Sequence, residues 1–149
     1  MKIIVDANIV FSAMLNTESK IGDLLLNSGS FFDFIAPDFL RIEIRKHHSK
    51  LAKLLGCTVE EVQEVEFLIY KSITFISEEQ IAQTHWVSAW KLVAEVDPKD
   101  VSYVAYAKHF RCKVWSGDKV LIKGLLKNNF TKIISAEELF KLRQAKENN

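Results

Sequence analysis

The stretch DPKDVSYVAYAKHFRCKVWSGDK, Asp97–Lys119, predicts a helix followed by a short strand, with acidic residues at the start of the helix and beyond the end of the strand. Its first residue can cap the helix, Pro98 suits the first helical position, and Asp100 lies in the first turn. Lys113–Trp115 has the apolar character of a buried strand, and Asp118 follows its carboxyl end. Because ligands of open α/β sheets bind outside the carboxyl ends of the strands, we expect a site here.

The rest of the chain predicts more short apolar strands separated by helices. Lys2–Val5 forms such a strand and is followed at once by Asp6. A longer helix is expected from Asp38 to Leu55, with Glu43 on or beside the side that should be buried. This alternation predicts a short, mostly parallel central sheet covered on both faces by helices, a three-layer α/β/α sandwich.

Composition favours a soluble globular protein, since 48% of the 149 residues are hydrophobic and 26% are charged. We expect one domain over residues 1–149, with residues 141–149 frayed. No apolar run is long enough for a membrane helix, and the N-terminus lacks the layout of a signal peptide, so a cytoplasmic location is expected. Cys57 and Cys112 stand far apart, a spacing that suggests neither a disulfide framework nor a zinc site.

Charge is unevenly distributed along the chain although the formal net charge is only +1. Residues 101–149 carry ten Lys/Arg and four acids, whereas residues 58–100 carry three Lys/Arg and nine acids. Such segregation fits a polyanionic substrate that approaches one face, although solvated helix faces without a binding function would show a similar pattern.

Four carboxylates occupy positions that could converge at one edge of the predicted sheet: Asp6, Glu43, Asp100 and Asp118. Each aspartate could also be an ordinary turn or first-turn residue, and for Asp97 a capping role is favoured. Clustered carboxylates raise one another's pKa unless a cation lies among them. Mg²⁺ prefers such oxygen ligands and often acts on phosphate substrates, so the pattern indicates phosphodiester hydrolysis.

These segments together resemble the PIN-domain family of nucleases. The resemblance covers VDAN at Val5–Asn8, PDFLRIEI around Glu43, DPKDVSYVAYAK at Asp97–Lys108 and WSGDKVL at Trp115–Leu121, in order along the chain. It implies a Mg²⁺- or Mn²⁺-dependent endoribonuclease that binds RNA. Many members of the family are toxins of toxin–antitoxin pairs, often homodimeric and blocked by an antitoxin protein, and the resemblance implies such partners here.

The resemblance also implies roles for individual residues. Asp6, Glu43, Asp100 and Asp118 match the acidic quartet of the family and are expected to be catalytic and to bind metal. Asp97 matches an additional acid that some members carry and is a further candidate metal ligand. Polar positions beside the first and last acids correspond to Asn8 and Ser116, which could support the site. Among the basic residues expected to hold substrate phosphates are Arg45, Lys46 and Lys119.

Two alternatives remain beside the nuclease hypothesis. The chain could be a catalytically inert PIN-like binding or scaffold module that acts through partners, although the complete acidic quartet argues against this. It could instead be a phosphotransfer domain with an aspartyl nucleophile. That class is disfavoured because DAN at Asp6–Asn8 differs from the DxD of such phosphatases, and no acidic pair suited to a receiver domain is seen near the first strand. The segment from Gly56 to Val93 is longer than in compact toxins, which bears on the toxin role more than on the nuclease fold.

Overall fold

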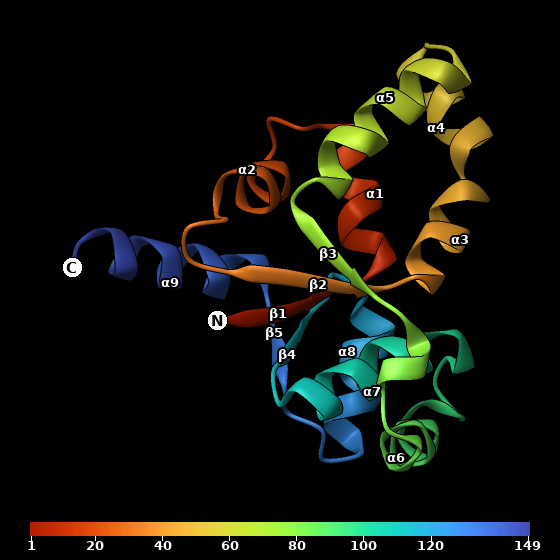
Figure 1. The fold of residues 1–149 in the computed structure, drawn as a ribbon, viewed down its shortest axis with the longest axis vertical. Coiled ribbons are helices and arrows are strands. Elements are labelled where there is room, and N and C mark those ends of the chain that lie inside the picture. Colours follow the sequence, from red (N-terminus) through yellow and green to blue (C-terminus); the bar gives the residue numbers. More distant parts are fainter.

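A computed structural model describes residues 1–149 and contains a five-stranded sheet with the order β3-β2-β1-β4-β5 (Figure 1). The strands are β1 Lys2–Val5, β2 Asp33–Pro37, β3 Ile73–Ile76, β4 Lys113–Trp115 and β5 Ile133–Ile134. All neighbouring pairs are parallel. The predicted short parallel sheet is therefore confirmed.

Helices cover both faces of this sheet (Figure 1). Helices α1 to α5 lie largely on one face, and α6 to α8 lie on the other, where α7 packs on β1, β2 and β4. None of the helices is both long and apolar enough to cross a membrane. Their bounds are α1 Ala7–Leu15, α2 Lys20–Asn27, α3 Phe39–Arg45, α4 His48–Leu55, α5 Val59–Tyr70, α6 Gln83–Val93, α7 Val101–Phe110, α8 Lys119–Lys127 and α9 Ala136–Glu147, with short 3₁₀ helices η1 Glu78–Gln80 and η2 Pro98–Asp100.

The strand order reverses between β1 and β4. From β1 the chain moves outward to β2 and β3, then returns to place β4 on the other side of β1 and continues to β5. Val5 and Trp115, the last residues of β1 and β4, are direct neighbours in the register. This is the topological switch point of the sheet, where the connections after two adjacent strands diverge and leave a crevice.

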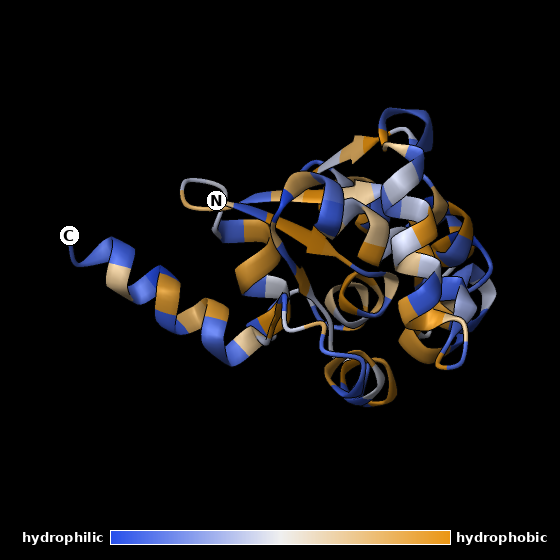
Figure 2. Cartoon of the chain, turned by 90° about the horizontal axis from the view of Figure 1, so that it is seen from below, coloured by the Kyte–Doolittle hydropathy of each residue, from blue (hydrophilic) through white to orange (hydrophobic).

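The core explains why the central stretch of the sequence is apolar. In β1, Ile3, Ile4 and Val5 are fully buried, and in α7 every residue from Ser102 to Ala107 is buried. Helix α7 is covered by the sheet on one side and by α6 on the other. Figure 2 shows hydrophobic strands in the middle of the domain and a largely hydrophilic helix ending at the C-terminus.

The single helix expected from Asp38 to Leu55 is instead two helices, α3 and α4, separated at Lys46 and His47. The His47 N–H donates to the Ile44 carbonyl, three residues back, and the backbone at His47 has ψ near 5°, so the α-helical path is broken. The second helix packs on α5, where His48 contacts Glu66. A tertiary contact of this kind leaves no signal in the local sequence.

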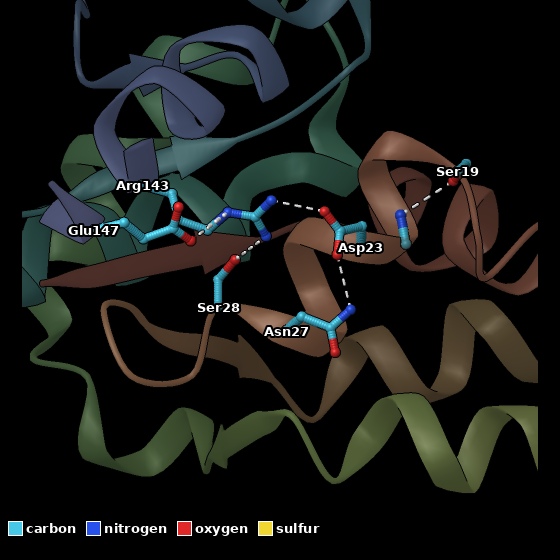
Figure 3. A network of polar contacts seen from close by, with 7 residues as sticks. Ser19, Asp23, Asn27, Ser28, Arg143 and Glu147 are labelled. Carbon is cyan, nitrogen blue, oxygen red and sulfur yellow. Dashed lines mark hydrogen bonds and ion pairs between the residues drawn. The ribbon is translucent and has the colours of Figure 1, made fainter. Parts of the chain in front are cut away.

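The C-terminal segment also differs from expectation, because α9 continues through Glu147 rather than fraying from residue 141. Arg143 anchors it: the side chain is only 8% exposed and donates to Asp23 Oδ2 at 2.7 Å and to Ser28 Oγ at 3.1 Å (Figure 3). A weaker ion pair joins Arg143 to Glu147. The guanidinium thereby fastens α9 to α2 and to the turn that follows it.

Replacement of Arg143 by Met is expected to lower the free energy of unfolding by about 2 kcal/mol. The change keeps most of the buried aliphatic volume but leaves Ser28 and Asp23 without their donor. Urea unfolding monitored by circular dichroism measures the loss. The matched control is Lys146→Met on the exposed side of the same helix, which should change stability by less than about 0.5 kcal/mol. Equal stability of the two variants would contradict the anchoring role.

Candidate functional site

Asp6 lies at the carboxyl end of β1, on the switch point, and is 2% exposed. One carboxylate oxygen, Oδ1, accepts from the Ile9 N–H at 3.0 Å and so caps α1. The other, Oδ2, is buried without a hydrogen-bond partner. Burial raises the pKa of Asp6 from 3.8 to about 6; nearby Ser116 and the Ile9 N–H oppose the rise, and the charges of Asp118 and Glu43 reinforce it.

Asp118 follows β4, the strand adjacent to β1, and caps α8 in the same manner. Its Oδ1 accepts from the N–H groups of Val120 and Leu121 at 3.0 and 3.1 Å. Ser116 lies between the two aspartates: it is buried, and its Oγ accepts from the Asp118 N–H at 3.1 Å. Asp6 and Asp118 each use one carboxylate oxygen to cap a helix. Both carboxylates therefore lie at a helix N-terminus, where the helix dipole favours negative charge.

Asp100 lies at the N-terminal end of α7 but makes no capping hydrogen bond with its side chain. Its Oδ2 is buried and unpartnered. Burial, together with the charges of Asp97, Asp6, Asp118 and Glu43, raises the pKa of Asp100 from 3.8 to about 7. Asp97 has a capping role, since its Oδ1 accepts from the Lys99 N–H at 3.1 Å, but its charge still acts on Asp100.

Glu43 reaches the same place from α3. Its Oε1 accepts from the Tyr103 hydroxyl at 2.6 Å, which ties α3 to α7. Burial raises the pKa of Tyr103, and the charge of Glu43 adds to the rise, so this hydroxyl remains a donor. The start of α3 is held by a second long-range bond, in which Glu78 accepts from the Phe39 N–H at 3.0 Å.

The five predicted acids therefore share one electrostatic neighbourhood at the carboxyl edge of the sheet. The charges of Asp6, Glu43, Asp97 and Asp118 all act on Asp100. The arrangement is open: no three His, Cys, Asp or Glu side chains form a compact group that could hold a metal ion.

The residues present nevertheless fit a hard divalent cation. Two carboxylate oxygens, Asp6 Oδ2 and Asp100 Oδ2, are buried without any donor. A buried, unpaired acceptor on an ionised group is costly unless a cation or donor satisfies it. Since the donor set consists of oxygens alone, the cation chemistry that it suits is that of Mg²⁺ or Mn²⁺.

The other predicted site residues, Asn8, Arg45, Lys46 and Lys119, form no hydrogen bond or salt bridge with the site acids. Asn8 is exposed in the first turn of α1, and its side chain makes no hydrogen bond. Arg45, Lys46 and Lys119 are all exposed. Arg45 lies one turn beyond Arg41, which stacks on Tyr70, and its charge also acts on Tyr70. It therefore belongs to the side of α3 that faces α5, whereas Lys119 directly follows Asp118.

Sequence reasoning missed Tyr103, the one hydroxyl that donates to a site carboxylate across two helices. A signal was present: Tyr103 comes three residues after Asp100, on the same side of a helix whose inner face is otherwise built from small and branched residues. Ser102, also missed, is buried beside Asp100 with an unpartnered Oγ.

Tyr103→Phe should lower the free energy of unfolding at pH 7 by about 2 kcal/mol, because Glu43 loses its charge-assisted donor. Ring volume is preserved, so the core should stay intact. Chemical unfolding measures the change. The control is Tyr106→Phe in the same helix, whose hydroxyl donates to a backbone carbonyl, that of Ile76, rather than to a carboxylate. A larger loss in the control than in Tyr103→Phe would contradict the assigned contact.

Comparison with known proteins agrees with this fold. The PIN domain family model matches residues 4–139. No curated protein sequence matches the chain. Among solved structures, VapBC2 from Rickettsia felis bound to a DNA fragment from their promoter aligns with a TM-score of 0.68 at 12% identity, covering 91% of this chain and 98% of that chain.

Two further structures are similar. PAE2754 from Pyrobaculum aerophilum has a TM-score of 0.68 at 14% identity and covers 97% of this chain and 90% of that one. VapBC-1 from nontypeable Haemophilus influenzae has a TM-score of 0.65 at 11% identity, with 92% and 99% covered. At such identities the structures establish the fold alone, and the family match spans most of the sequence. The chain belongs to the PIN domain family.

Proposed function

We propose that the chain is a metal-dependent endoribonuclease that hydrolyses phosphodiester bonds of RNA at the carboxyl edge of its sheet. The observation that carries the proposal is Asp6, a buried carboxylate at the switch point with one oxygen unpaired and with Asp118, Glu43 and Asp100 in its neighbourhood. Membership of a family of nucleases supports the same class of reaction.

Asp6, Asp100 and Asp118 would hold Mg²⁺ or Mn²⁺, with Glu43 and Asp97 at the margin of the site. When bound there, a divalent cation would supply positive charge to offset the carboxylates and to polarise the scissile phosphodiester and an attacking water. The chain supplies the positioning. Helix N-termini orient Asp6 and Asp118, Ser116 fixes the turn that leads from β4 to Asp118, and Tyr103 holds Glu43 in place. Basic side chains such as Lys46 and Lys119 would bind flanking phosphates.

The direct test incubates the purified protein with an end-labelled single-stranded RNA in Mg²⁺, in Mn²⁺ and in excess EDTA. Internal cleavage is expected with either metal and none with EDTA, and thermal unfolding should shift upward at millimolar metal. Absence of cleavage together with absence of a thermal shift would overturn the proposal and favour the inert module.

We further propose that an antitoxin protein controls this activity, as part of a toxin–antitoxin pair. The similarity to structures named VapBC supports this partner. Expression of the chain alone should arrest growth of a bacterial host, and co-expression of a small open reading frame that adjoins its gene should restore growth. Growth that is unaffected by an active nuclease would contradict the toxin role and leave the enzymatic proposal standing.

A second copy of the chain is the proposed occupant of an apolar surface on α3 and α6. Ile42, Val87 and Trp90 are about half exposed there. They line two recesses that adjoin through Trp86 and Val101. Contiguous exposed apolar surface of this kind is typical of protein interfaces.

Trp90→Glu is accordingly expected to convert a dimer into a monomer, since a charge would be buried against apolar surface. Analytical ultracentrifugation at micromolar concentration measures the change. Leu126→Glu, an equally exposed apolar position on α8, is the control and should leave the dimer intact. A wild-type protein that sediments as a monomer would contradict the proposal.

A further inference from the structure

The side of the sheet where the strands begin, opposite the carboxylates, carries a recess that is lined by basic residues and by no acid. Its volume is about 600 Å³, and its lining includes Lys108, Arg111, Lys132, His85 and Thr131. A second recess of about 350 Å³ shares Arg111 and Lys132 and adds Lys2 and Lys113. No acid lines either recess, and none of these lysines and arginines forms a salt bridge.

The strands place several of these cations side by side. The Val114 N–H donates to the Lys132 carbonyl at 2.9 Å, so Lys113, the first residue of β4, and Lys132, which directly precedes β5, lie next to each other. Lys2 begins the next strand, where Ile3 pairs with Lys113. Like charges on neighbouring strands destabilise a sheet. Lys2 lies opposite Asp33 in the register of β1 and β2, whereas no acid lines the recesses beside Lys113 and Lys132. The row is therefore complementary to an external anion.

Backbone conformation at the recess shows a second unusual feature. Arg111 and Asn129 are the two non-glycine residues with positive φ, at 53° and 64°, and both line the first recess. Glycine would satisfy this backbone more easily than arginine. Arg111 therefore carries a long basic side chain at a position where the backbone conformation favours glycine.

Helix α8 connects this recess to the acidic edge. It begins directly after Asp118 and ends near Asn129, at the recess. Its buried face carries Leu121 and Leu125, and its exposed face carries Lys119, Lys123 and Lys127, one on each successive turn. The three lysines span about 12 Å along the helix and lead from the acids to the recess.

From this placement we infer that Lys119, Lys123 and Lys127, together with the recess at Arg111 and Lys132, form a continuous track for the phosphate backbone of single-stranded RNA on one side of the cleaved bond. The inference rests on the proposed nuclease function, since the track starts where the scissile phosphodiester would lie. An RNA strand fits because it carries one phosphate per nucleotide along its length, matching cations presented in series. An acidic peptide would need no continuity with the carboxylate edge.

The test compares two double charge reversals that change the net charge equally. Lys127→Glu/Lys132→Glu removes two cations from the track, and Lys141→Glu/Lys146→Glu changes exposed lysines on α9, outside it. Fluorescence anisotropy with an eight-nucleotide RNA, in Mg²⁺ with Asp6→Asn present to prevent cleavage, gives the dissociation constant at several salt concentrations. The track variant should bind about tenfold more weakly, with a salt slope shallower by about 1.4, and the α9 variant should match the parent.

Cleavage by the same pairs of variants with Asp6 intact separates the two proposals. RNA cut by all of them with unchanged KM would overturn the track and leave the nuclease function standing. RNA bound through the track by a protein that cuts nothing would support the track and overturn the nuclease function. Equal loss of binding in both double variants would show only general attraction to positive charge and would overturn the track. Binding of polyglutamate, with no binding of RNA, would assign the surface to an acidic protein and overturn it as well.

Discussion

Asp6→Asn is expected to lower the rate of RNA cleavage at least about 10³-fold while leaving the fold intact. The asparagine oxygen can still accept from the Ile9 N–H and cap α1. What the change removes is the negative charge on the oxygen that has no partner inside the protein. Initial rates on a labelled RNA in saturating Mg²⁺ measure the effect, with circular dichroism to verify folding.

The matched control is Asp33→Asn. Asp33 is an exposed aspartate at the start of β2, and so lies at the amino ends of the strands, on the opposite side of the sheet from the proposed site. The same chemical change there should leave the cleavage rate within about twofold of wild type. If Asp6→Asn retained the wild-type rate, Asp6 would be removed from the reaction and the remaining carboxylates would have to act without it.

The fold is largely predictable from local pattern because buried parallel strands are short, apolar and continuous. Lys2–Val5 and Lys113–Trp115 are each followed by an acidic turn. Since the carboxyl ends of parallel strands lie on one side of the sheet, this pattern predicts that Asp6 and Asp118 share that side. That the two strands are direct neighbours comes from the topology of the sheet. Local pattern leaves open whether such acids cap helices or serve a site. In the folded chain, Oδ1 of each caps a helix, which leaves the second oxygen of each carboxylate free of that role.

The features that sequence reasoning missed depend on contacts between distant segments. Tyr103 meets Glu43 across 60 residues, and Arg143 meets Asp23 across 120. Helical spacing places Tyr103 on the same side of α7 as Asp100, but it does not identify Glu43 as its partner, and no local pattern pairs Arg143 with Asp23. The break between α3 and α4 is likewise accompanied by a contact between distant segments, that of His48 with Glu66 of α5. Local pattern therefore specifies the elements and their order, whereas the partners of individual polar side chains are set by the tertiary packing.

In the absence of divalent metal, Asp6 should make the protein less stable as the pH rises from about 4 to about 6. Burial raises the pKa of the Asp6 carboxyl from 3.8 in the unfolded chain to about 6 in the folded protein. Between these values the folded state binds more protons than the unfolded state, so stability falls with rising pH and levels off above about 6. The shift corresponds to about 3 kcal/mol.

Asp6→Asn removes this penalty, so in EDTA at pH 7.5 the variant should exceed the wild type by up to about 3 kcal/mol in the free energy of unfolding, and the difference should vanish near pH 4. Asp23, whose pKa is lowered by Arg143, titrates in both proteins and cancels in the comparison. Asp100, whose pKa is raised to about 7, loses in the variant the repulsion of the Asp6 charge, which adds to the gain in stability in the same direction. Urea unfolding at several pH values measures the difference directly. Millimolar Mg²⁺ should stabilise the wild type and narrow the gap, because the cation offsets the buried charge that only the wild type carries. A constant difference across pH 4 to 8 would mean that Asp6 is not a buried, uncompensated carboxylate.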